Sequence, residues 1–236
     1  MITCPVCQNH NHHLAVKCAS CGSYLQTKIE NLDLFSTGWK VLEHPLNAFY
    51  TIAVAKHKNY SIILSVISGV ALTFFSFWLM KAGDAASSLI NFLVAGFAVA
   101  PFVGILSVLV VALLIKITVS ASGRSVTFRN AFAVIAYTQV PLVISVILIF
   151  PLELMTFGLY FFTTNPSPYQ LKPLPYILLS GMDGIFAFWS LLLIWMGIKK
   201  LTDGGWFYSL GISIIVLVLF GSLVFGIFHF VSPLPQ

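Results

Sequence analysis

The chain has 236 residues, of which 58% are hydrophobic and only 8% are charged. An ordinary soluble domain carries about 25% charged residues. A soluble globular fold could not bury so much apolar surface, so this composition excludes that class and predicts an integral membrane protein.

The N-terminal segment contains the strongest local motif. All four cysteines lie in the first 21 residues, as Cys4-Pro-Val-Cys7 and Cys18-Ala-Ser-Cys21, and Gly22 follows the second pair. Two C-x-x-C turns can place four thiolates about 2.3 Å from one metal ion, and closed four-sulfur sites of this kind are structural zinc sites. Glycine after the second pair suits a tight turn because it accepts a positive φ. We therefore predict a structural Zn²⁺ bound by these four cysteines.

Residues 1–26 are accordingly predicted to form a zinc-ribbon-like cytoplasmic head that needs its metal to fold. Iron in the same sulfur cage, two disulfides and a redox C-x-x-C site are the alternatives; a reducing cytoplasm argues against disulfides, and a redox site would need a surrounding βαβ domain. His10, His12 and His13 could replace a cysteine, but the complete cysteine set predicts solvated loop histidines. A closed site leaves no position for a substrate, which favours structure or docking over catalysis.

Residues 27–59 are predicted to link the head to the membrane. Apolar residues recur there at helical spacing beside lysines, namely Trp39, Leu42, Leu46, Phe49, Tyr50 and Ala53. This pattern predicts an amphipathic helix in the membrane interface, in which Pro45 is acceptable as a first helical residue. A linker helix packed against the cytoplasmic loops is the alternative.

Five apolar runs follow, each long enough to cross a hydrocarbon core about 30 Å thick. They lie at about 61–80, 89–117, 131–150, 177–198 and 207–231. Each run is continuously apolar, whereas the strands of a β-barrel would alternate apolar and polar residues. The predicted fold class is thus an all-α integral membrane protein with five transmembrane helices over residues 60–231. Because residues 1–33 are polar, we expect the first of these helices, rather than a cleaved signal peptide, to direct insertion.

Basic residues are distributed unevenly between alternate loops, and they favour the cytoplasmic side. One side carries Lys17, Lys28, Lys40, Lys56, Lys58, Lys116, Arg124, Arg129, Lys199 and Lys200. The other side carries only Lys81 and Lys172. This asymmetry predicts a cytoplasmic N-terminus and an external C-terminus, in the cell membrane if the protein is prokaryotic. It also explains the net charge of +5, so nucleic-acid binding is not indicated.

Polar residues within the spans are candidates for function, because ionisable groups in a bilayer are costly. Asp183 lies in the fourth span, and Gln139 stands beside Pro141 in the third. Pro141, and Pro101 in the second span, are expected to kink their helices. An ion or proton path near Asp183 and Gln139 is one interpretation; a pairing of Asp183 with Lys172 or with a buried backbone group is the other.

Catalytic motifs are absent from the sequence. It contains no H-E-x-x-H, no G-x-S-x-G and no P-loop. Glu153 is expected just beyond the third span, which leaves Asp183 as the only acidic residue clearly inside one. We therefore predict that the protein is not an enzyme.

A family resemblance emerges from the second loop and the third span. Phe128-x-x-Ala131-x-x-Val134-x-Ala136-Tyr137 precedes a proline, His44-Pro45 opens a pre-membrane segment that runs to Ile52, and Trp195-x-Gly197 ends the fourth span. These features resemble the prokaryotic members of the Yip family of Rab-interacting membrane proteins, over about residues 44–231. The family implies five spans and, in eukaryotes, a role in trafficking. The acidic Asp-Leu-Tyr-Gly-Pro stretch of eukaryotic relatives is absent, so the resemblance assigns Rab binding to no residue here.

The sequence as a whole predicts a non-catalytic membrane scaffold, or an assembly or trafficking factor. It would hold a cytoplasmic or membrane protein partner through its zinc head and its basic loops. The alternative is a channel, transporter or permease subunit with a polar path near Asp183 and Gln139.

Overall fold

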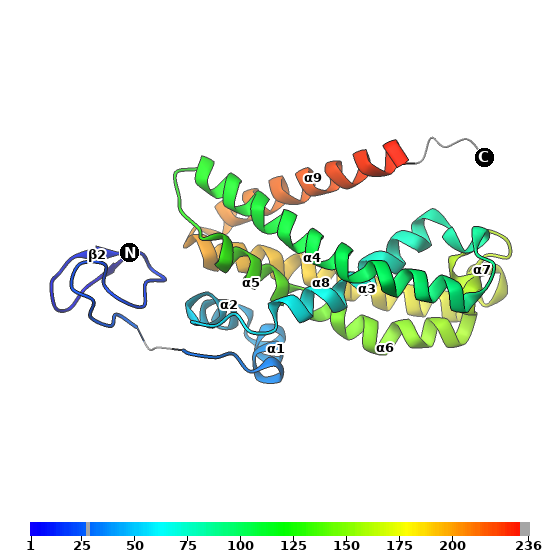
Figure 1. The fold of residues 1–236 in the computed structure, drawn as a ribbon, viewed down its shortest axis with the longest axis horizontal. Helices are drawn as coiled ribbons and strands as arrows, with labels where there is room; N and C mark the ends of the chain where they lie inside the picture. Colours follow the sequence, from blue (N-terminus) through cyan, green and yellow to red (C-terminus); the bar gives the residue numbers. More distant parts are fainter. Residues whose placement is uncertain (27–28, 232–236) are drawn as a thin grey trace. The chain divides into compact units, whose positions relative to one another are not determined.

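The computed structural model describes residues 1–26 and 29–231, with side chains described up to residue 226. Its elements, in chain order, are β1 (Ile2–Thr3), β2 (His10–Asn11), α1 (Leu34–Glu43), α2 (Pro45–Val54), α3 (Ser61–Met80), the 3₁₀ turn η1 (Ala82–Ala85), α4 (Leu89–Ala121), α5 (Phe128–Thr138), α6 (Val140–Phe157), the 3₁₀ turn η2 (Gly158–Phe162), α7 (Pro168–Leu171), α8 (Pro173–Thr202) and α9 (Trp206–Val231) (Figure 1). The described part of the chain is mainly helical, and its one sheet is the antiparallel pair of β1 and β2.

Five helical segments are long and apolar enough to cross a membrane. They are Ser61–Met80, Leu89–Ala121, Phe128–Phe162, Pro173–Thr202 and Trp206–Gly226. The predicted all-α membrane class is confirmed. Several of these helices extend beyond the apolar runs that predicted them, because a helix can continue into the polar boundary where its backbone still forms internal hydrogen bonds.

The chain divides into two compact units. The first, here called the basal unit, comprises residues 1–60, 110–135 and 194–236, and the second, the helical unit, comprises residues 61–109 and 136–193. The head and the linker helices belong to the basal unit, and α4, α5 and α8 each contribute residues to both units.

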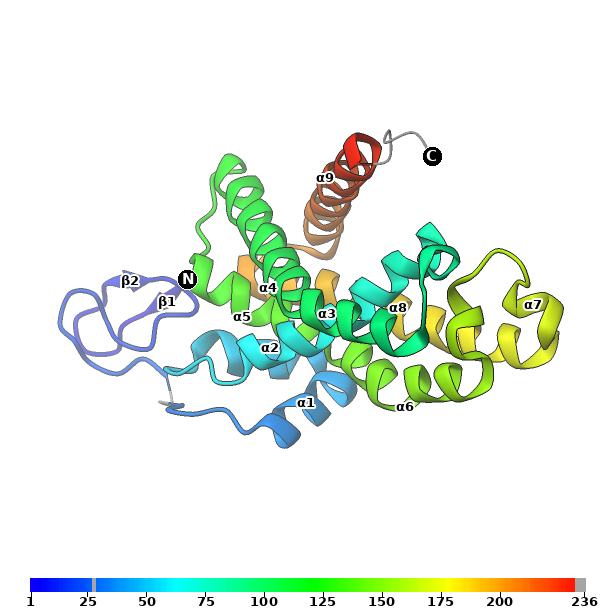
Figure 2. The same cartoon turned by 45° about the vertical axis from the view of Figure 1, so that its right-hand side comes forward.

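The linker of the basal unit contains two helices where the sequence predicted one. Asp33 begins α1 by accepting a hydrogen bond from the Ser36 N–H at 2.7 Å, and Pro45 occupies the first turn of α2, as predicted. The two helices fold against each other (Figure 2). Phe49 is fully buried, whereas Trp39 is 67% exposed. The aromatic residues of the linker therefore do not all have the same environment: Phe49 packs inside the protein, and Trp39 lies on its outside.

Aromatic rings form the core of the helical unit. The Phe74 ring of α3 lies 4.6 Å from the Phe150 ring of α6, and it also contacts Phe92 of α4 and Phe162 of η2. Aromatic pairs at these separations add about 0.5–1.5 kcal/mol each to the gain from burial. Many of the phenylalanines thus hold this unit together.

The third span is interrupted at Gln139, between α5 and α6. Pro141 lies in the first turn of α6, where a missing N–H costs little. The third span thus breaks beside Pro141, where a distortion was expected. Pro101 lies within the continuous helix α4, and the kink expected there stays a prediction. Glu153 lies inside the third candidate span, not beyond it as expected, because α6 also continues through Pro151 to Phe157.

Candidate metal centre

The head contains two turns with the same backbone hydrogen bonds. In the first, the Gln8 N–H donates to the Cys4 carbonyl at 2.9 Å; in the second, the Gly22 N–H donates to the Cys18 carbonyl at 3.0 Å. Gln8 and Gly22 both have a positive φ, of 58° and 74°. The role expected of Gly22 is confirmed, and Gln8 has the same role in the first turn. Two equivalent turns thus present the two cysteine pairs.

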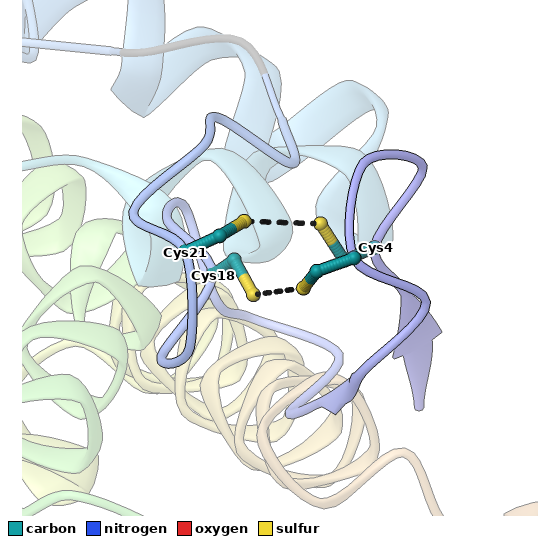
Figure 3. Close-up of side chains that lie close together, drawn as sticks. Cys4, Cys18 and Cys21 are labelled. Atoms are coloured by element: carbon teal, nitrogen blue, oxygen red, sulfur yellow. Dashed lines mark hydrogen bonds between the residues drawn. The ribbon is translucent and has the colours of Figure 1, made fainter.

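The four sulfur atoms converge on one point (Figure 3). Cys4 Sγ lies 3.6 Å from Cys21 Sγ, Cys7 Sγ lies 3.5 Å from Cys18 Sγ, and all four atoms lie within 4.8 Å of one another. A regular tetrahedron with metal–sulfur bonds of 2.3 Å has edges of about 3.8 Å. The cysteines are free thiols, not disulfides. Their arrangement therefore fits a four-coordinate metal ion, which would stabilise the head and supply no chemistry to a substrate.

Polar groups surround the sulfur atoms and orient them. The Ser23 hydroxyl lies 3.1 Å from both Cys4 Sγ and Cys21 Sγ. The buried Asn11 side chain donates to Cys18 Sγ at 3.5 Å and accepts from the Ala19 N–H at 2.9 Å. Such outer hydrogen bonds fix the ligands of metal sites. Ser23 and Asn11 could not be predicted as partners of the thiols, because nothing in the C-x-x-C spacing indicates which polar residues lie beside it.

These hydrogen bonds also change the acidity of the thiols. The Ser23 hydroxyl is the main reason that the pKa of Cys4 falls to about 6. Although the Asn9 N–H lowers the pKa of Cys7, the neighbouring Cys21 thiol and burial raise it to about 12. Thiolates are the metal-binding form of cysteine, so the site already favours that form at Cys4.

The histidines of the head lie outside this cluster. Among the residues that the structure describes, the four cysteines are the one group of potential metal ligands that lies together. His13 Nε2 is instead 3.3 Å from the Lys200 carbonyl oxygen at the end of α8, and burial lowers the pKa of His13. His13 thus links the head to the rest of the basal unit.

Two arginines join the loops of the basal unit. Arg124 donates to the Thr202 carbonyl at 2.8 Å, and its guanidinium lies 4.8 Å from the centre of the Tyr208 ring. Arg129 donates to the Lys56 carbonyl at 2.6 Å. Both acceptors lie at or just beyond the C-terminal end of a helix, where carbonyl groups lack helical partners. Part of the basic charge therefore stabilises the unit itself.

A third cation has the same role at the end of α2. Lys58 donates to the carbonyls of Ile52 and Ala53, at 2.6 Å for Ala53. Burial, assisted by Arg129, lowers the pKa of Lys58 to about 8. The exposed lysines at positions 40, 56 and 116 remain as candidates for a partner surface.

Asp183 does not pair with Lys172, which was one of the partners considered for it. Asp183 accepts a hydrogen bond from the Ser145 hydroxyl of α6. Lys172 donates to the Thr156 carbonyl at 3.4 Å instead of pairing with Asp183. Gln139 Nε2 donates to the Thr138 hydroxyl at 3.2 Å. The partners of Asp183 could not be predicted, because they depend on how the helices pack.

These features define a multi-pass helical membrane protein with a four-thiol head. The family model described as Yip1 domain matches residues 39–227. The chain therefore belongs to the Yip1 family, and the resemblance seen in the sequence is confirmed. The match begins within α1, beyond the cysteine head. No curated protein and no solved structure matches the chain.

Proposed function

We propose that this protein is a non-catalytic membrane scaffold that docks a cytoplasmic protein through a zinc-bound head and the exposed basic residues of the basal unit. Membership of the Yip1 family and the apolar helices fit a membrane-associated trafficking role. The observation that carries the proposal is the convergence of Cys4, Cys7, Cys18 and Cys21 in one compact cluster. A four-sulfur cage has no open coordination position, so we assign it a role in docking.

The distribution of charge supports a cytoplasmic location for the head. Lys81 and Lys172 are the only basic residues of the helical unit, and all others in the sequence fall within the basal unit. The positive-inside rule then assigns the head and the loops at 122–127 and 203–205 to the cytoplasm and the C-terminus to the outside.

The partner that fits this surface has apolar and acidic groups. Phe35 and Trp39 of α1 are 85% and 67% exposed, and the exposed Lys40 follows them in the same helix. Val6 and Tyr24 of the head are also exposed. Aromatic anchors beside basic groups are typical of protein interfaces. We assign this surface to an acidic segment of a cytoplasmic protein.

The test is affinity capture of the full-length protein after crosslinking in intact membranes. Cys4→Ser with Cys18→Ser removes two ligands, and we expect the crosslinked partner to be lost while the protein remains inserted. His10→Ala is the matched control, because His10 is an exposed head residue outside the thiol cluster. If the cysteine variant recovered as much crosslinked partner as the His10→Ala control, the head would be excluded as the docking element. Substrate flux in vesicles that contain only this protein would support the transporter alternative instead.

A further inference from the structure

A pair of acidic side chains meets inside the helical unit. Glu153 of α6 is 3% exposed. Its side chain is within hydrogen-bonding reach of Asp183 of α8, which is half-buried and also accepts from Ser145. Both carboxyl groups lie within candidate membrane spans.

Two ionised carboxylates cannot form this contact, because neither has a proton to donate. Glu153 Oε1 is buried and has no hydrogen-bond donor among the residues that the structure describes. An ionised carboxylate with an unsatisfied buried oxygen is costly by several kcal/mol. One proton on Glu153 removes this cost, since the acid can then donate to ionised Asp183.

We propose that Glu153 and Asp183 form a proton-binding site that holds one shared proton inside the membrane domain. Glu153 carries the proton and donates it in a hydrogen bond to Asp183, while the Ser145 hydroxyl stabilises the charge on Asp183. The chemistry is that of carboxyl pairs that share one proton, because two carboxyl groups at short distance cannot both be ionised. This site does not depend on the docking role proposed for the head.

The sequence of the helical unit contains few other charged residues. Neither α3 nor the part of α4 in this unit contains a titratable residue. The other titratable residues of the unit are Lys81, Asp84, Tyr137, Tyr160, Tyr169, Lys172 and Tyr176. The Lys172 ammonium group donates to the Thr156 carbonyl, and the Asp84 carboxylate accepts from the Thr164 N–H.

Ca²⁺ fits this site poorly, because it takes six to eight oxygen ligands. The site offers two carboxyl groups and one hydroxyl. A proton needs only two of these oxygen atoms, one to carry it and one to accept its hydrogen bond.

Dicyclohexylcarbodiimide tests the site, because it reacts with protonated carboxyl groups in apolar surroundings and leaves a stable adduct. The full-length protein in liposomes is treated over a range of pH, and adducts are located by mass spectrometry of peptides. We expect an adduct on Glu153 at neutral pH. In Asp183→Asn the amide can donate to ionised Glu153, which then no longer needs a proton. The pH profile of labelling should therefore shift by at least one pH unit, so that labelling at neutral pH falls about tenfold.

The matched control is Ser107→Ala in α4, which removes a hydroxyl that donates to the Gly104 carbonyl of its own helix at 2.9 Å and leaves the carboxyl pair intact; it should keep the adduct on Glu153. The infrared spectrum of the unmodified protein at neutral pH gives a second readout, the carbonyl stretch of a protonated carboxylic acid, which should disappear in Glu153→Gln. Absence of both signals from the folded wild-type protein would overturn the proposal. An identical labelling profile in Asp183→Asn would overturn it as well.

Discussion

The crossing of α3 and α4 depends on two glycines that face each other. A Cβ atom added to Gly104 would meet the Ser65 carbonyl oxygen and would lie 2.8 Å from the Gly69 Cα. A Cβ atom added to Gly69 would meet the Ala100 carbonyl oxygen and lie 2.8 Å from the Gly104 Cα. Small residues allow such close backbone approach in membrane helices. Gly104→Ala should therefore force the two helices apart.

The size of the effect follows from the contact distances. Carbon atoms in ordinary contact lie about 3.5–4.0 Å apart, so the new methyl group requires a shift of about 1 Å between two backbones that cannot rotate out of the way. Overpacking of this kind costs about 1–3 kcal/mol. Alanine stabilises a helix relative to glycine by roughly 0.5–1 kcal/mol, so the expected net loss in unfolding free energy is about 0–2.5 kcal/mol.

The matched control is Gly211→Ala in α9, because a Cβ atom at Gly211 has no neighbour within 4 Å. Unfolding of both variants is followed by far-UV circular dichroism during titration with a denaturing detergent. Gly104→Ala should unfold at a lower detergent fraction than the wild type, and Gly211→Ala at an equal or higher one. If both variants behaved alike, the close crossing of α3 and α4 would be refuted.

Three further predictions concern the loops and the orientation. Arg124→Ala removes the hydrogen bond to Thr202 and the contact with Tyr208, and should lower the free energy of unfolding by about 1 kcal/mol; an unchanged melting temperature would contradict this. The hydrogen bonds with Thr164 lower the pKa of Asp84, so the stabilisation is present above the unfolded pKa and is lost as pH falls through the folded one. Asp84→Ala should thus lower the melting temperature at neutral pH but not in strong acid, and an equal difference at both would be contrary evidence. The C-terminus is predicted to be external, so an alkaline phosphatase fused to it should be active. An inactive fusion would contradict this orientation.

The membrane fold was predictable because it depends on properties that are local in sequence. A run of about 20 apolar residues can satisfy its backbone hydrogen bonds in lipid only as a helix. The spacing of Cys4, Cys7, Cys18 and Cys21 is similarly local, so the cluster could be anticipated. Gln8 could not, because a non-glycine residue with a positive φ gives no signal in the sequence.

The features that were missed depend on packing between segments distant in the sequence. Pro151 marked the end of an apolar run, but α6 continues through it, which places Glu153 inside a span beside Asp183. The linker pattern predicted one interfacial helix, but Phe49 is buried in the protein. Helical periodicity identifies an apolar face and does not specify whether lipid or protein covers it.

The metal content of the purified full-length protein tests the central claim most directly. Inductively coupled plasma mass spectrometry of the protein in mild detergent should find one zinc ion per chain, and the Cys4→Ser, Cys18→Ser variant should retain none. A wild-type protein without bound metal, or with iron in place of zinc, would contradict the zinc-bound head on which the proposed docking role depends.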